Sequence, residues 1–202
     1  MSGAAIILAL TLGVSVLGLL SPRIIAKAVL RPYAITHGSG YLTLLTSGFV
    51  HADLTHLLFN LITYYSFAFS LERAIGTSSF VTLYFCGLLL SGLGTCFKHR
   101  NDPGYASLGA SGAILAVLFA SIVYFPQQRL FILPIPLPIP APLFALAYLA
   151  FSYYSARRNA AGGAADRINH DAHIFGALTG LAFVLCTAPR QFMVLLHTIR
   201  PG

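Results

Sequence analysis

The stretch GASGAILAVLFASIVYF, residues 109–125, places a glycine-framed serine, Ser111, at the start of an apolar run. Only 8% of the 202 residues are charged, whereas 57% are hydrophobic and the mean hydropathy is +0.80. So few polar side chains cannot cover the surface of a soluble globule. The composition therefore predicts an integral membrane protein in which residues 1–202 form one domain.

Hydropathy indicates six membrane-spanning segments, so the predicted fold class is an all-α membrane protein with six transmembrane helices. The segments run roughly over residues 4–20, 55–71, 78–97, 111–125, 143–156 and 172–188. The fourth and fifth are short for a full crossing, so they either begin inside the membrane or follow a loop that dips into it. The first segment has no preceding Lys or Arg and no small-residue cleavage site, which favours a retained anchor over a signal peptide.

The connections between these segments differ in character. The loop after the first segment is about thirty residues long and partly apolar, so we expect it to lie in the membrane interface or pack on the bundle. The segment Pro134–Pro142 alternates proline with apolar residues, which predicts an extended, stiff spacer. Residues 160–165 contain only alanine and glycine and are typical of a flexible tether.

The basic residues and cysteines exclude other classes of site. The net charge of +7 comes from scattered basic residues between apolar segments, which indicates anchoring at lipid headgroups rather than nucleic-acid binding. The cysteines are odd in number and lie inside apolar runs, so neither a disulfide framework nor a zinc site is indicated. They are Cys86, Cys96 and Cys186.

Four polar residues are expected to converge at one depth of the membrane. His56 and Asn60 lie in the first turns of the second segment, Ser111 opens the fourth, and His173 opens the sixth. Even-numbered crossings all enter the bilayer from the same side. Polar groups inside a membrane usually face the bundle interior and pair with one another. The alternative is that Ser111 bonds back to its own helix and that the histidines only pack.

These residues suit nucleophilic acyl transfer. A serine hydroxyl needs a base to take its proton, and the imidazole of His173 is suited to that role. His56 and Asn60 are four residues apart, so they share one helix face and could donate to an oxyanion. The Ser111 backbone N–H at a helix start would add a further donor.

The five carboxylates offer no third catalytic member. None lies deep in a segment, and Asp171 and Asp53 are expected to cap helices, so we predict a Ser/His dyad. Gly176 and Gly180 form a small-residue face that, with Gly112, predicts contact between the fourth and sixth helices. The remaining histidines are expected to be solvated or interfacial; they are His37, His99, His170 and His197.

Three motifs in order resemble the signature of rhomboid intramembrane serine proteases. They are Gly109-Ala110-Ser111-Gly112, His51-x4-His56-x3-Asn60 and Ala172-His173-x2-Gly176-x3-Gly180. The resemblance implies a rhomboid-like bundle in a bacterial inner membrane and a protease that cuts transmembrane protein substrates without cofactor or metal.

The same resemblance implies residue roles. Ser111 would be the nucleophile and His173 its base. His56 and Asn60 would line the oxyanion site, and His51 would be structural. In the family the fifth helix is thought to gate substrate entry, which would let the proline-rich spacer position that helix.

The chain departs from the family pattern at two places. Many rhomboids carry a Trp-Arg pair in the first loop, where this chain has Leu42-Thr43. Some relatives carry a tyrosine that stacks on the catalytic histidine, where this chain has Leu115. The departures concern the first loop and the orientation of His173.

Membrane orientation and function class leave alternatives open. Loops on the N-terminal side hold 4 basic residues and those on the opposite side hold 8, which favours a cytoplasmic catalytic face, whereas well-known bacterial rhomboids suggest the outer face. A non-catalytic rhomboid-like protein that binds membrane helices is the alternative function. A small transporter would spread its polar residues along the membrane depth, and here they gather near one face.

Overall fold

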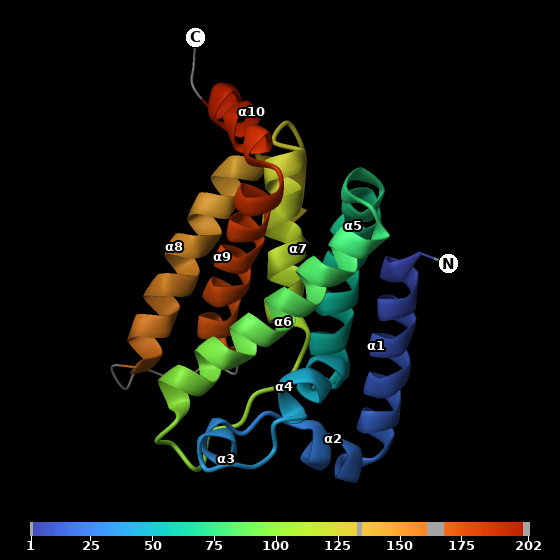
Figure 1. Ribbon diagram of the computed structural model, residues 1–202, viewed down its shortest axis with the longest axis vertical. Coiled ribbons are helices and arrows are strands. Elements are labelled where there is room, and N and C mark those ends of the chain that lie inside the picture. The colour runs from blue at the N-terminus through green and yellow to red at the C-terminus, as the bar shows by residue number, and fades with distance from the viewer. Residues whose placement is uncertain (1, 133–134, 161–167, 200–202) are drawn as a thin grey trace.

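The computed structural model describes residues 2–132, 135–160 and 168–199 (Figure 1). In chain order the elements are α1 (Gly3–Leu20), α2 (Pro22–Ala28), α3 (Pro32–Thr36), α4 (Thr43–Thr46), the 3-10 turn η1 (Ser47–Phe49), α5 (Leu54–Ile75), α6 (Thr77–His99), α7 (Ser111–Tyr124), β1 (Arg129–Ile132), β2 (Ile135–Pro140), α8 (Ala141–Ala160), α9 (His170–Thr187) and α10 (Pro189–Ile199). Each of the six predicted apolar segments is a helix. The predicted tether, from residue 161 onward, lies outside the described residues.

Two helices in the described part of the chain, α1 and α6, are long and apolar enough to cross a membrane. A third candidate is α9 together with α10, which are bent by 112° at their junction. Helix α7 is apolar but has only 14 residues. The fold is therefore a helical one with two or three candidate spans, and the number of six crossings stays a prediction.

Helix α7 lies at the centre of the bundle. Every residue from Gly112 to Val123 is buried, because the helix is small or apolar on all sides and has no polar face to turn toward water. It packs against α5, α6 and α9. In Figure 1 helices α5, α7 and α9 all run upward, starting above α2 and α3, so the expected common direction of these three helices is present.

The long first loop packs on the bundle, which is one of the two placements expected for it. Helices α3 and α4 both pack against α6. Leu30 and Ser107 exchange two backbone hydrogen bonds of 2.9 Å each, which joins this loop to the segment that leads into α7. The first loop therefore helps to fix the approach to Ser111.

The start of α1 is held by a carboxylate from another helix. Glu72, near the end of α5, accepts hydrogen bonds from the N–H groups of Gly3 at 2.6 Å and Ala4 at 3.2 Å, and from the hydroxyls of Ser2 and Thr77. These N–H groups have no partner within their own helix, and a carboxylate also matches the positive end of the helix. Glu72 is thus fully engaged at the end of α5 opposite to His56.

Residues 135–140 of the proline-rich segment are extended, as predicted, but they form one strand of a hairpin rather than a single spacer. Pro134 lies outside the described residues, and Ala141 and Pro142 already belong to α8. Strand β2 pairs antiparallel with β1, with Arg129 opposite Pro140 and a register shift between Phe131 and Ile132. The prolines are tolerated because a two-stranded sheet consists only of edges. The all-α prediction was incomplete here, because a proline pattern does not reveal the partner strand. The hairpin follows the end of α7, far along that helix from Ser111.

Candidate active site

Ser111 is the first residue of α7, and the chain reaches it through a glycine with a left-handed backbone. Gly109 has a φ of 107°, a region that favours glycine. Its N–H donates to the Ser47 carbonyl at 2.9 Å, which ties the approach to η1. Ala110 precedes the helix, and no described side chain caps it. The first-turn N–H groups of α7 are therefore suited to stabilise a developing negative charge.

The His56 ring lies against the backbone just before the serine. A Cβ atom added to Gly109 would lie 2.7 Å from Cε1 and 2.9 Å from Nε2 of His56. The helix that carries this histidine is capped as predicted, because the Asp53 carboxylate accepts a 2.8 Å hydrogen bond from the His56 N–H. Only glycine at position 109 leaves room for this imidazole two residues from Ser111.

Asn60 follows one turn later and is also directed toward α7. Its side chain is buried, and Nδ2 donates to the His56 carbonyl at 3.0 Å. Asn60 and Ala110 line the same small cavity between α1, α5, α6 and α7. A carboxamide carries two N–H donors, so this bond within α5 uses only one of them.

His51 supports His56 from behind. Its side chain is fully buried, and its ring meets the His56 ring edge-on with 4.9 Å between centroids. The Ser15 hydroxyl donates to the Phe49 carbonyl at 2.9 Å and therefore accepts from Nδ1–H of His51 at 2.8 Å. Nε2 of His51 is buried and has no hydrogen-bond partner within the described residues. The geometry fits a neutral, structural histidine.

Burial of His51 makes stability depend on pH. Burial, with a smaller effect from His56, lowers the pKa of His51 from 6.5 to about 4. Between these pH values the unfolded chain binds the proton and the folded protein does not, so stability is complete above pH 6.5 and falls as the pH drops toward 4. We expect a loss of about 3 kcal/mol across this range. Chemical unfolding in detergent at several pH values, compared with His51→Gln, measures it; parallel curves for the two proteins would contradict the assignment.

Glycines bring α7 and α9 into backbone contact, as predicted from Gly176 and Gly180. A Cβ atom on Gly176 would lie 2.1 Å from the Gly112 carbonyl oxygen, and one on Gly180 would lie 2.2 Å from that of Ala116. At the start of the contact, a Cβ atom on Gly112 would lie 3.4 Å from the Ala172 carbonyl oxygen. The neighbours of these last two residues are Ser111 and His173, so the contact between the two helices begins next to the candidate nucleophile and the candidate base.

A tyrosine of α8, which the sequence analysis did not single out, contacts the candidate base. The Tyr148 hydroxyl lies 2.8 Å from Nδ1 of His173, and the two ring centroids are 6.1 Å apart. Its only sequence signal is a polar tip within an apolar segment. The expected Ser/His dyad thus has a neutral third neighbour, and the catalytic roles of Ser111 and His173 stay predictions.

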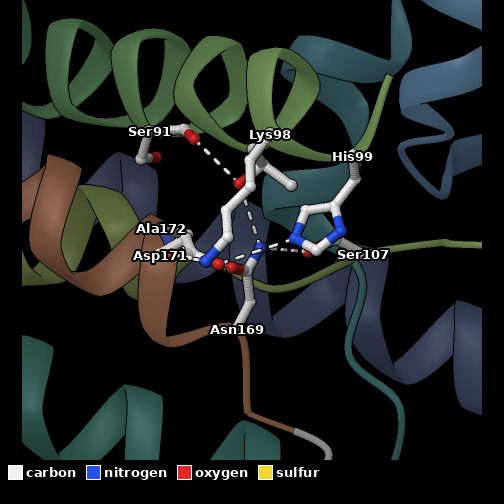
Figure 2. Close-up of polar contacts among 8 residues, drawn as sticks. Ser91, Lys98, His99, Ser107, Asn169, Asp171 and Ala172 are labelled. Carbon is white, nitrogen blue, oxygen red and sulfur yellow. Dashed lines mark hydrogen bonds and ion pairs between the residues drawn. The ribbon is translucent and has the colours of Figure 1, made fainter. Parts of the chain in front are cut away.

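A polar network anchors the start of α9 (Figure 2). Asn169 caps the helix by accepting from the Ala172 N–H at 3.0 Å. Its Nδ2 donates to the hydroxyls of Thr95 at 3.0 Å and Ser107 at 2.9 Å. These bonds join α9 to α6 and to the segment before α7, so they position the turn that carries His173.

Two predictions about this region were wrong. Asp171 is not the cap of α9; it forms an ion pair with Lys98 at 2.6 Å and lies 3.5 Å from Nε2 of His99, both on α6. His170 was expected to be solvated, but it is 2% exposed, with its ring 5.5 Å from Phe151 and 5.9 Å from His173 between centroids. The helix begins two residues earlier than predicted, which moves the cap to Asn169 and turns His170 inward.

Comparison with known proteins adds independent information. The family model described as Rhomboid domain matches residues 38–190. The putative rhomboid protease YdcA of Bacillus subtilis is 29% identical over 151 residues, which cover 73% of this chain and 68% of that protein. The human mitochondrial presenilin-associated rhomboid-like protein is 32% identical over 148 residues, which cover 70% of this chain and 36% of that protein.

A yeast relative extends this pattern. Rhomboid protein 1, mitochondrial, of Saccharomyces cerevisiae is 29% identical over 147 residues, which cover 70% of this chain and 40% of that protein. The chain therefore spans about two thirds of the bacterial relative and less than half of the two mitochondrial ones.

Proposed function

Since the chain belongs to the rhomboid family of helical membrane proteins, we propose that it is an intramembrane serine endopeptidase that cleaves transmembrane protein substrates. In this proposal Ser111 is the nucleophile and His173 is the general base and acid. His56, Asn60 and the Ser111 backbone N–H form the oxyanion site. The supporting residues are His51, Gly109, Gly112, Gly176 and Gly180.

One observation carries the proposal: the glycine contact between α7 and α9 starts at Gly112 and Ala172, the immediate neighbours of Ser111 and His173. Two residues before the serine, the His56 ring lies on Gly109. In this proposal a nucleophile, a base and an oxyanion donor come from three different helices, α7, α9 and α5, which approach one another at these glycines. Such an arrangement is what acyl transfer requires.

The proposed reaction has two steps. In acylation, Oγ of Ser111 attacks the substrate carbonyl carbon while Nε2 of His173 takes the hydroxyl proton; the oxyanion then collapses, the C–N bond breaks, and His173 returns the proton to the leaving amine. In deacylation, water gives a proton to His173 and its oxygen attacks the ester carbonyl. The ester bond breaks, the new carboxyl group leaves, and Ser111 regains its proton.

The proposal includes six membrane crossings. Helices α5, α7 and α8 are not candidate spans by their own length and composition, so we propose that they cross the membrane as parts of the bundle. The relatives come from a bacterium and from mitochondria, so the bacterial inner membrane stays a prediction. The compartment that the catalytic face meets depends on which set of loops, those on the N-terminal side or those on the opposite side, lies in the cytoplasm. Labelling of cysteines introduced into the loops, from each side of the membrane, would decide between the cytoplasmic catalytic face that the basic residues favour and the outer face that the family resemblance suggests.

Labelling with a fluorophosphonate tests the proposal. We expect the detergent-solubilised protein to be labelled, because the reagent reacts with serines that a base activates. Ser111→Ala should remove the labelling, whereas Ser121→Ala, which alters a buried serine on the same helix, should keep it. Absence of labelling in the unaltered protein, or equal labelling of Ser111→Ala, would overturn the proposal. The former result, combined with capture of single-span helices, would support the non-catalytic binding protein instead.

A further inference from the structure

We infer that Tyr148 is a positioning residue that fixes the tautomer and orientation of His173, an inference that rests on the proposed function. The hydroxyl of Tyr148 lies 2.8 Å from Nδ1 of His173, which leaves Nε2 as the ring nitrogen that serves the serine in the proposed function. Tyr148 does not touch the reacting atoms. Its role is to act through the base.

The tautomer argument follows from the chemistry of imidazole. A neutral imidazole has one N–H and one lone pair, so Nε2 can take the Ser111 proton only when Nδ1 carries the hydrogen. An acceptor beside Nδ1 selects that tautomer. The hydroxyl of Tyr148 is at hydrogen-bond distance and can either donate to Nδ1 or accept from Nδ1–H; in this inference its own hydrogen points away from the imidazole, so that its oxygen accepts.

The position of the Tyr148 hydroxyl is set by packing. Its ring stacks on Phe144, with 5.6 Å between centroids, and lies 6.4 Å from Phe119 of α7. The side chain joins the apolar cluster that contains Leu115 and Ala177. Because aromatic rings from α7 and α8 hold it, the tyrosine can restrict the motion of the imidazole rather than follow it.

Tyr148 also accounts for the departure at Leu115. Leu115 is buried in the apolar cluster, and its side chain has no polar group that could orient an imidazole. The tyrosine that contacts His173 instead comes from α8, which packs on α9. The orientation of the base is therefore tied to the packing of α8 against α9.

Tyr148→Phe tests the inference because it removes only the hydroxyl and keeps the ring between Phe144 and Phe119. Fluorophosphonate labelling at several concentrations separates reagent binding from the rate of serine phosphonylation. We expect the maximal phosphonylation rate to fall about 10- to 100-fold with unchanged reagent binding, because a neutral acceptor orients the base without adding charge. Tyr154→Phe, at an exposed tyrosine of the same helix, should change neither quantity.

A nitrogen-15 NMR spectrum of histidine-labelled protein gives a readout that does not depend on activity. The His173 signals, assigned by comparison with His173→Gln, should show one tautomer with a protected Nδ1–H, and Tyr148→Phe should convert them to a mixture. An unlabelled parent protein would refute the proposed function, and the NMR spectra would still decide the role of Tyr148. Unchanged labelling and unchanged His173 signals in Tyr148→Phe would refute the positioning role alone.

Discussion

His173→Gln is expected to slow phosphonylation of Ser111 by a fluorophosphonate by about 10³- to 10⁴-fold, because the hydroxyl then has no base to take its proton. The measurement is the rate of fluorophosphonate labelling in detergent, together with the midpoint of thermal unfolding. Glutamine retains an N–H that can reach Tyr148, so the fold should be kept. The effect should therefore appear in the rate rather than in stability.

The matched control is His197→Gln, which replaces an exposed histidine of α10. We expect it to label at the rate of the unaltered protein. If His173→Gln labelled as fast as His197→Gln, His173 would not be the base. The pairing of α7 and α9 would then have a purely structural meaning.

Gly176→Ala is expected to destabilise the fold by about 3 kcal/mol and to abolish labelling, because the new methyl group meets backbone that cannot move aside. Its Cβ atom would lie 2.1 Å from the Gly112 carbonyl oxygen and 2.8 Å from the carbonyl carbon. The helices must separate to accommodate it. Separation at this point moves His173 away from Ser111, so stability and activity should fall together.

Gly13→Ala supplies the control for the same chemical change. Gly13 lies within α1, and a Cβ atom there would meet nothing within 4 Å. Because alanine is the better helix former, the substitution should be neutral or stabilising by up to about 1 kcal/mol. Unfolding by denaturant in micelles compares the two variants. Equal stability of Gly176→Ala and Gly13→Ala would contradict a backbone contact between α7 and α9.

The helices were predictable from sequence because the signals for them are local. Apolar runs marked all six segments, and the common direction of α5, α7 and α9 followed from counting them. The contact that Gly176 and Gly180 make with α7 was also predictable from the sequence, because a spacing of four residues places both glycines on one helix face. These inferences need no knowledge of how distant side chains pack.

The features that sequence could not supply depend on tertiary packing or on the exact start of a helix. Tyr148 is an ordinary residue of an apolar segment until α8 is packed against α9. A shift of two residues in the start of α9 gave the cap to Asn169 and left Asp171 for an ion pair. The hairpin was missed because Arg129–Ile132 has no proline pattern of its own.

The enclosure of α7 has a consequence for how the membrane acts on the proposed catalytic centre. Since every residue from Gly112 to Val123 is buried by other parts of the protein, α7 presents no surface of its own to the lipid acyl chains. Bilayer thickness and fluidity therefore reach it only through the tilt and spacing of the outer helices. This helix is shielded from the lipid from Gly112 onward, so any sensitivity of the protein to lipid composition must reach it through the helices that surround it.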